Sequence, residues 1–283
     1  MILLRPPWTR QPPYPARIDR ANPLALGLVS LILPGQSRRD IAGQIDLSST
    51  SGSVSTSLTG DGYALRLDGN QEAIYTTASP AMQALSAQGS ILWVGTLLGA
   101  PSGSAALGGI TANNTNALPY VLLEIKRTPS TADTIYLNYS VSSTVYQNVI
   151  STGTYTSGAV IVVGTFVSGS QRLYIRSASG VERITGTDSG ALYSTSTARI
   201  EVGDSLNGRN PNAACAMQAI ASRAWTEDEC KQLLENPWQL FAPFERRIWV
   251  PSAGGSYTHP ALSNARMGSL TSTGGVPTAD YAF

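Results

Sequence analysis

Charged side chains are scarce in this sequence. Only 13% of its 283 residues are Asp, Glu, Lys or Arg, and the formal net charge is +1. An ordinary soluble protein has about 25% charged residues, and a chain with so little net charge exerts no general attraction on polyanions. The composition therefore argues against binding of nucleic acid or of anionic membranes. Neutral hydroxyl and amide groups must cover much of the surface, unless an assembly hides it.

Cysteine and histidine are also scarce. Cys215 and Cys230 are too few for a disulfide scaffold, and together with His259, the one histidine, they cannot form a closed zinc site. We therefore expect two buried free thiols. A Ser-His-Asp triad is disfavoured as well, because His259 lies beyond the predicted domain and an appendage would have to supply the base.

Long apolar runs are missing too. The best candidate, Leu24 to Leu33, stops at Pro34 and is shorter than the roughly 18 apolar residues of a membrane-spanning helix. The apolar run after Met1 ends at Arg5, which is too short for the core of a signal peptide. The sequence therefore predicts neither a membrane span nor an export signal.

Residues 1–23 contain six prolines, and they predict an extended arm. Proline fixes φ and pushes its neighbours toward extended conformations, so neither a helix nor a central strand is expected there. A disordered tail is the alternative. Trp8 and Tyr14 favour an arm that lies on another surface, because a solvated tail has no need of two aromatic rings.

The segment from Leu24 to Val250 predicts an antiparallel β-sandwich. Short β-runs alternate with clusters of Gly, Ser and Asn, which is typical of that architecture. Residues 168–171 predict a hairpin turn between two of the strands. In the second of these strands we expect Leu173 and Ile175 on one face and Tyr174 and Arg176 on the other. The predicted strands are 63–68, 91–98, 120–126, 134–139, 159–167, 172–176 and 198–203.

A single helix is predicted near the end of this segment. Thr226 and Glu229 have the spacing of a capping box, and residues 227–229 place three acidic groups at the positive end of the helix dipole. These acidic groups are therefore interpreted as a helix cap and not as a catalytic cluster. Pro237 ends the helix. An apolar stripe with helical spacing follows the cap: Cys230, Leu233 and Leu234.

The order of several pieces resembles the concanavalin A-like, laminin G-type jelly-roll domains found in virion proteins of tailed bacteriophages. The pieces are GDGYALRLDG from Gly60, the strand ILWVGTLL from Ile91, VIVVGTF from Val160, RLYI from Arg172, and IASRAWTEDE from Ile220 leading into ENPWQLF from Glu235. The resemblance implies a jelly-roll sandwich over 24–251, after the proline-rich arm at 1–23. It also implies a linker and a small C-terminal β-module at 252–283.

Jelly rolls of this kind include glucan hydrolases, whose catalytic residues have a recognisable spacing. A retaining glucanase needs two carboxyl groups about 5 to 5.5 Å apart, supplied by a Glu-x-Asp-x-x-Glu run on one strand face. No such run occurs, and Glu201 and Asp204 fall on opposite faces of a strand. We therefore expect a protein that is not an enzyme. Calcium is the one cofactor left open, with Asp204 and Asn207 as weak candidate ligands and turn capping as the alternative.

Two polar stretches offer groups that suit sugar binding, although ordinary polar loops have the same composition. Directional hydrogen bonds to sugar hydroxyls need amides and hydroxyls, and the apolar side of a sugar ring needs an aromatic face. Loops at the ends of sandwich strands are common places for binding groups. The candidate glycan-binding residues are Asn113, Asn114, Asn116 and Tyr120 in the first stretch, and Asn207, Arg209, Asn210 and Asn212 in the second.

Residues 235–251 concentrate aromatic area between three prolines. Part of this area must seal the sandwich, and part is expected to anchor an assembly, since Trp and Arg are favoured at interfaces. An ordinary last strand of the core is the alternative for residues 246–250. The candidate assembly residues, in both termini, are Trp8, Tyr14, Trp238, Phe241, Phe244, Arg247, Trp249, Tyr281 and Phe283.

The resemblance implies a non-enzymatic structural protein of a phage particle, assembled in the host bacterial cytoplasm. A tail or baseplate adhesin that displays the sandwich toward cell-surface glycans is the first interpretation. A head decoration or cement protein, whose arms clamp neighbouring subunits, is the second. The expected partners are other virion proteins and further copies of this chain, with a trimer favoured, and neither nucleic acid nor membrane insertion is expected.

Overall fold

A computed structural model describes twelve parts of the chain. Within these parts, no helix has the length and apolar character needed to cross a membrane. The predicted C-terminal module at 252–283 lies outside them. The described residues are 8–49, 55–60, 62–68, 73–76, 88–99, 104–112, 121–128, 131–141, 145–188, 190, 198–203 and 212–243.

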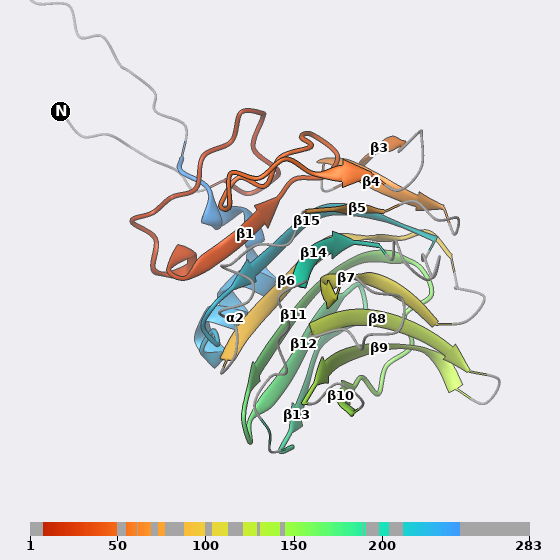
Figure 1. Cartoon of the computed structure of the whole chain (residues 1–283). Coiled ribbons are helices and arrows are strands. Elements are labelled where there is room, and N and C mark those ends of the chain that lie inside the picture. Colours follow the sequence, from red (N-terminus) through yellow and green to blue (C-terminus); the bar gives the residue numbers. More distant parts are fainter. Residues whose placement is uncertain are drawn as a thin grey trace, which may run out of the picture. The chain divides into compact units, whose positions relative to one another are not determined.

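The first of two antiparallel sheets has eight strands (Figure 1). Its order is β13-β12-β11-β6-β15-β4-β3, and β1 also pairs with β15. The predicted hairpin is confirmed, because β11 and β12 pair directly and Gly164 lies opposite Leu173. The strands are β1 (Leu28–Ile32), β3 (Thr56–Thr59), β4 (Gly62–Asp68), β6 (Gln88–Leu97), β11 (Gly158–Val167), β12 (Gln171–Ser177), β13 (Gly180–Gly186) and β15 (Asn212–Ala221).

The second sheet has seven strands, in the order β10-β9-β8-β7-β14-β5-β2. Each neighbouring pair is antiparallel. The prediction of an antiparallel β-sandwich is therefore confirmed. The strands are β2 (Ser48–Ser49), β5 (Ile74–Tyr75), β7 (Ser104–Ala112), β8 (Val121–Thr128), β9 (Thr131–Ser140), β10 (Tyr146–Ile150) and β14 (Ala198–Val202).

The main core lies between the two sheets. Alternating side chains of both sheets enter it, among them Trp93 of β6, Leu137 of β9 and Ile200 of β14. The expected alternation of side chains between the two faces of β12 is confirmed. Leu173 and Ile175 belong to this core, whereas Tyr174 lies on the other face. Strand β6 is buried on both faces, as its continuous apolar run predicts.

A second apolar cluster covers the outer face of the eight-stranded sheet. The helix α2 (Glu227–Glu235) and the 3-10 helices η1 (Pro23–Ala25) and η2 (Pro237–Leu240) pack there, in the region of β6 and β15 in Figure 1. Residues 8–23 join this cover by contacts within the chain. The Trp8 Nε1 donates to the Ala242 carbonyl oxygen at 2.8 Å, and the Asp19 amide donates to the Leu240 carbonyl oxygen at 2.9 Å. The described part of the arm therefore lies on its own domain.

The predicted helix cap is confirmed. Thr226 Oγ1 accepts a hydrogen bond from the Glu229 amide at 3.3 Å, and the Glu229 carboxylate accepts one from the Thr226 amide at 2.8 Å. The apolar stripe of α2 is buried as expected, and the helix ends at Glu235. The Glu229 carboxylate therefore serves as part of the helix cap.

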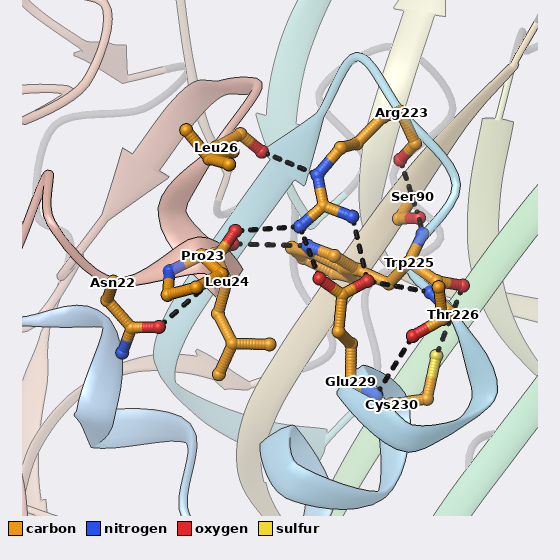
Figure 2. Close-up of polar contacts among 10 residues, drawn as sticks. All are labelled: Asn22, Pro23, Leu24, Leu26, Ser90, Arg223, Trp225, Thr226, Glu229 and Cys230. Atoms are coloured by element: carbon orange, nitrogen blue, oxygen red, sulfur yellow. Dashed lines mark hydrogen bonds and ion pairs between the residues drawn. The ribbon is translucent and has the colours of Figure 1, made fainter.

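Arg223 ties this helix to the segment around η1 (Figure 2). Its guanidinium pairs with both oxygens of Glu229, at 2.7 Å each. The same group donates to the carbonyl oxygens of Leu26 at 2.9 Å and Pro23 at 2.8 Å. Next to it, the Trp225 Nε1 donates to the Leu24 carbonyl oxygen at 3.2 Å. Two segments about two hundred residues apart are therefore joined by directional bonds as well as by apolar contact.

Candidate functional site

The outer face of the seven-stranded sheet carries charged and amide side chains that are buried. Residues that alternate with the core positions of β5, β7, β8, β9 and β14 point away from the core. On β7 they include the small residues Ala106 and Gly109, and most of the others are charged, amide, hydroxyl or aromatic. We give the name outer polar face to the residues Tyr75, Thr111, Glu124, Tyr136, Asn138, Arg199 and Glu201.

One half of the outer polar face is built around an ion pair on β14. Arg199 and Glu201 form a salt bridge, although their side chains are only 6% and 0% exposed. The Arg199 guanidinium also lies over the ring of Tyr75, with its central carbon 4.3 Å from the ring centroid. Register explains the arrangement, because Glu201 is directly opposite Tyr75 on β5. The paired strands β5 and β14 thus place an aromatic ring next to a fixed charge pair.

The other half is a carboxylate–amide pair on β8 and β9. The Asn138 Nδ2 donates to the Glu124 carboxylate at 2.6 Å, and both residues are nearly fully buried. A carboxylate only accepts hydrogen bonds, so the amide nitrogen must face it and the amide oxygen must face away. Among the described residues, no donor reaches the Asn138 Oδ1 or the Thr111 Oγ1. Both oxygens are buried, as is the Arg199 Nε, which also has no hydrogen-bond partner among the described residues.

Buried charge on the outside of a sheet is not explained by stability. Removing charges from water costs several kcal/mol per ion, and apolar replacements of buried pairs are often neutral or stabilising. Positions where a sequence departs from the simplest packing solution are commonly functional. Tyr75, Thr111 and Tyr136 are half-buried, so they are the members that solvent reaches. The outer polar face is therefore the candidate binding site.

Pairing also shows which connections leave the sheet near this site. Ala112 of β7 lies opposite Ala198 of β14, Val121 of β8 lies opposite Ile110, and the Thr76 amide donates to the Ile200 carbonyl oxygen. These residues lie at one end of the sheet, which we call the Ala198 end. The stretches that leave or enter there are 77–87, 113–120, 142–144 and 191–197.

The two predicted glycan-binding stretches do not leave the sandwich at the same end. Ala112 and Val121, the described residues on either side of 113–120, lie at the Ala198 end. Residues 204–211 follow Gly203, at the opposite end of β14. Asn212 is half-buried at the start of β15, opposite Asp68. The residues that lie outside the described parts are Asn113, Asn114, Asn116, Tyr120, Asn207, Arg209 and Asn210, together with the calcium candidate Asp204.

Two predicted assembly residues are instead part of the cover over the eight-stranded sheet. Trp238 is 4% and Phe241 1% exposed, and their rings stack with centroids 6.4 Å apart. Their assignment to an interface is therefore corrected, because packing within the chain already uses their area. Trp8 is half-buried on the same cover, whereas Tyr14 is 57% exposed. Phe244, Arg247, Trp249, Tyr281 and Phe283 lie outside the described residues.

The structure also brings together two carboxylates that the sequence keeps far apart. Glu124 and Glu201 share the outer polar face, but β7 lies between their strands. Strand spacing of about 4.8 Å sets their backbones roughly 10 Å apart across the sheet, and each carboxylate is already engaged by Asn138 or Arg199. Within the described ranges, no cluster of three or more His, Cys, Asp or Glu could hold a metal ion.

The two cysteines lie away from this site as buried free thiols, as expected. Burial raises the pKa of Cys215, and burial together with the nearby Glu229 raises the pKa of Cys230 to about 12. Both thiols are therefore protonated at neutral pH and unsuited to act as nucleophiles.

Comparison with known proteins defines the class of fold. No protein-family model and no curated protein matches the chain. The binding domain of Paraclostridial Mosquitocidal Protein 1 is similar, with a TM-score of 0.57 at 16% identity over 75% of this chain and 52% of that one. The binding domain of botulinum neurotoxin DC, solved in complex with SialylT, gives 0.55 at 13% identity over the same shares. This chain therefore aligns with about half the length of these two structures.

A third similar structure is domain 4 of an extracellular GH43 arabinanase from Geobacillus stearothermophilus, solved with arabinotriose. Its TM-score is 0.54 at 14% identity, over 73% of this chain and 98% of that one. At such identities the likeness concerns the fold alone. The chain thus shares the β-sandwich fold of these structures, and the predicted fold class, an antiparallel jelly-roll sandwich of the concanavalin A-like type, is confirmed. The phage part of the resemblance stays a prediction.

Proposed function

We propose that this protein is a non-catalytic carbohydrate-binding β-sandwich whose ligand lies on the outer polar face at its Ala198 end. The observation that carries the proposal is the buried set of Glu124, Asn138, Arg199 and Glu201 beside the ring of Tyr75. Sugar hydroxyls pair with carboxylates, amides and guanidinium groups held in fixed geometry, and a few such groups placed beside aromatic area are typical of ligand sites.

The fold and the sequence support the same function. One similar structure is a toxin binding domain in complex with SialylT, and another is an arabinanase domain in complex with arabinotriose. Ala112 and Val121, which flank the predicted glycan-binding stretch 113–120 in the sequence, lie at the Ala198 end of the sheet. The engagement of both carboxylates favours binding without hydrolysis.

A glycan array probed with the full chain tests this proposal, followed by calorimetric titration of the glycans that bind. Tyr75→Leu removes the half-buried aromatic ring of the face, and it should weaken binding about tenfold, because the sugar ring loses its aromatic partner. Tyr63→Leu, on β4 of the other sheet and 55% exposed, is the matched control and should bind like the wild type. Equal loss in both variants, or an unaffected Tyr75→Leu, would contradict the site.

We further propose that the chain serves in the virion of a tailed phage, as an adhesin of the tail or baseplate. The support is the sequence resemblance, above all the run from Ile220 to Phe241, and a sugar-compatible face suits an adhesin. Head decoration is the second candidate, and in either place we expect a homo-oligomer, with a trimer favoured. Labelling purified particles with antibody against this chain separates the two: signal at the tail tip supports the adhesin, and signal over the head supports decoration.

A further inference from the structure

We propose that the arm at residues 8–23 and the segment beside it form a docking surface for an acidic patch on a different protein. This surface lies on the side of the eight-stranded sheet, where the arm packs on the apolar cover, whereas the outer polar face belongs to the seven-stranded sheet. The inference therefore stands apart from glycan binding. We call it the arginine–tyrosine surface, and it consists of Arg10, Tyr14, Arg17, Arg20 and Arg38.

Hydrogen bonds within the chain hold the arm in a fixed loop. The Trp8 Nε1 donates to the Ala242 carbonyl oxygen, and the Ala242 amide donates to the Arg17 carbonyl oxygen at 2.8 Å. Between these two closing bonds, Gln11 bonds twice to Tyr63 of β4. Its Nε2 donates to the Tyr63 carbonyl oxygen at 2.9 Å, and its Oε1 accepts from the Tyr63 amide at 2.7 Å. The loop is therefore ordered before a partner binds, which lowers the entropic cost of binding.

Tyr14 is the exposed aromatic residue of this loop. It is 57% exposed and lies between two prolines, whose rings restrict the backbone. The Gln36 Nε2 donates to the Pro12 carbonyl oxygen at 3.0 Å, and this bond brings the segment that contains Arg38 next to the loop. Tyrosine and arginine are enriched among the residues that dominate the binding energy of protein interfaces. The loop thus presents a rigid aromatic anchor with arginines around it.

The four arginines of this surface are exposed and unpaired. Among the described residues, no hydrogen-bond or ion-pair partner reaches their guanidinium groups. The arginines around α2 are engaged instead, since Arg176, Arg183 and Arg223 bond to carbonyl or carboxylate oxygens within the chain. Residues 8–47 contain no lysine, and the planar fork of arginine matches a carboxylate. The unpaired charge therefore fits a partner that presents several Asp or Glu side chains.

The partner is expected to be a protein other than a second copy of this chain. Of the acidic residues whose exposure the structure describes, only Asp46, Asp228 and Glu235 are exposed, and the last two lie near opposite ends of α2. These residues do not form an acidic patch that could cover four arginines. A nucleic acid or an anionic membrane is disfavoured, because the net charge of the whole chain is only +1.

The test is titration of the full chain with synthetic peptides in which the number of Asp and Glu residues and the presence of an apolar residue vary independently. We expect the tightest binding from peptides that combine several carboxylates with an apolar residue, and we expect it to weaken at high ionic strength. Equal binding of acidic and neutral peptides overturns the inference. Tighter binding of duplex DNA or of phosphatidylserine vesicles overturns it too, as does self-association of the chain that Tyr14→Ala abolishes.

Two pairs of substitutions then assign the binding to the arginine–tyrosine surface. Arg10→Gln with Arg17→Gln should weaken the binding of acidic peptides at least about tenfold. Arg183→Gln with Lys231→Gln removes the same charge beside α2, so this matched control should bind like the wild type. Equal loss in both pairs would reveal general charge attraction and overturns the inference. Because the side chains of Arg10 and Arg17 have no partners within the described residues, the first pair should keep the wild-type unfolding temperature.

Discussion

The two sheets of this sandwich both have an outer face, and the two faces are built in opposite ways. Over the eight-stranded sheet lies an apolar cover that includes Trp225, Trp238 and Phe241. On the seven-stranded sheet the same alternation of side chains places Glu124, Asn138 and the Arg199–Glu201 pair on the face turned away from the core, where they are nevertheless buried. A sandwich needs only one core, so the chain closes one face with apolar packing and keeps polar chemistry on the other.

This difference between the two outer faces suggests that one face contributes to stability and the other to ligand binding. Apolar burial contributes about 25 cal/mol per Å², so the cover over the eight-stranded sheet adds stability beyond that of the core between the sheets. The buried charges of the outer polar face add little stability, because desolvation offsets their attraction. Substitutions on the two faces should therefore have separable consequences, for unfolding on one side and for binding on the other.

The largest expected effect is on the apolar cover. Trp225 is 2% exposed and donates to the Leu24 carbonyl oxygen, so Trp225→Ala leaves a cavity and an unpaired carbonyl. We expect a loss of about 4 kcal/mol in the free energy of unfolding, measured by urea titration. Leu26→Ala is the control, since Leu26 follows Leu24 closely in the sequence but is 58% exposed, and it should change stability by less than about 0.5 kcal/mol. Similar losses in both variants would show that the cover is not a packed layer.

The second largest effect is expected from substitutions of the Arg199–Glu201 pair on the outer polar face. Arg199→Met leaves Glu201 buried without its charge partner, which should cost about 3 kcal/mol in the free energy of unfolding. In the double variant Arg199→Met with Glu201→Met, both charges are removed, and stability should return to within about 1 kcal/mol of the wild type. Glycan binding should be lost in the single variant, and it should also be lost in the double variant, although the stability has returned. If binding survives there, the ion pair is structural and the comparison of the two faces fails.

Local chemistry of the sequence predicted the strong elements of the fold and missed others for identifiable reasons. The apolar run of β6, the β11–β12 hairpin and the capping box of α2 are local signals. Strands β7 and β15 consist largely of Ala and Gly, residues with little preference for strands. Their small side chains allow close approach instead: a Cβ at Gly108 would lie 2.1 Å from the Gln218 Oε1.

The candidate site was harder to predict than the fold. Alternation in the runs around Glu124, Asn138 and Arg199 predicts that these polar residues share a face of their own strand. These three residues come to lie on one face because β7 pairs with β8 on one side and with β14 on the other. Such long-range strand pairing cannot be predicted from a short run of residues. The polar loops were visible in the sequence for the opposite reason, because Asn-rich composition is a local feature. The same composition cannot say at which end of the sandwich a loop leaves.

The smallest expected effect concerns the ion pair between Arg223 and Glu229. This pair is partly exposed, and it therefore contrasts with the buried pair of Arg199 and Glu201 on the outer polar face. Hydrogen bonds from Arg223 lower the pKa of Glu229, although burial opposes them. A carboxyl group with a lowered pKa in the folded state stabilises the fold above its unfolded pKa, and this contribution is lost as the pH falls through the folded value. Wild-type stability should therefore fall between about pH 5 and pH 3, by an amount that includes about 1 kcal/mol from this pair.

In Glu229→Gln this part of the pH dependence should vanish, while the variant is less stable than the wild type at pH 7 by about the same amount. Arg223→Gln should flatten the curve similarly, because it removes the donors that lower the pKa of Glu229. Urea unfolding at pH 7 and at pH 3 measures both differences. Identical losses in the wild type and in both variants would mean that this pair, unlike the buried pair on the outer polar face, contributes nothing that unfolding can detect.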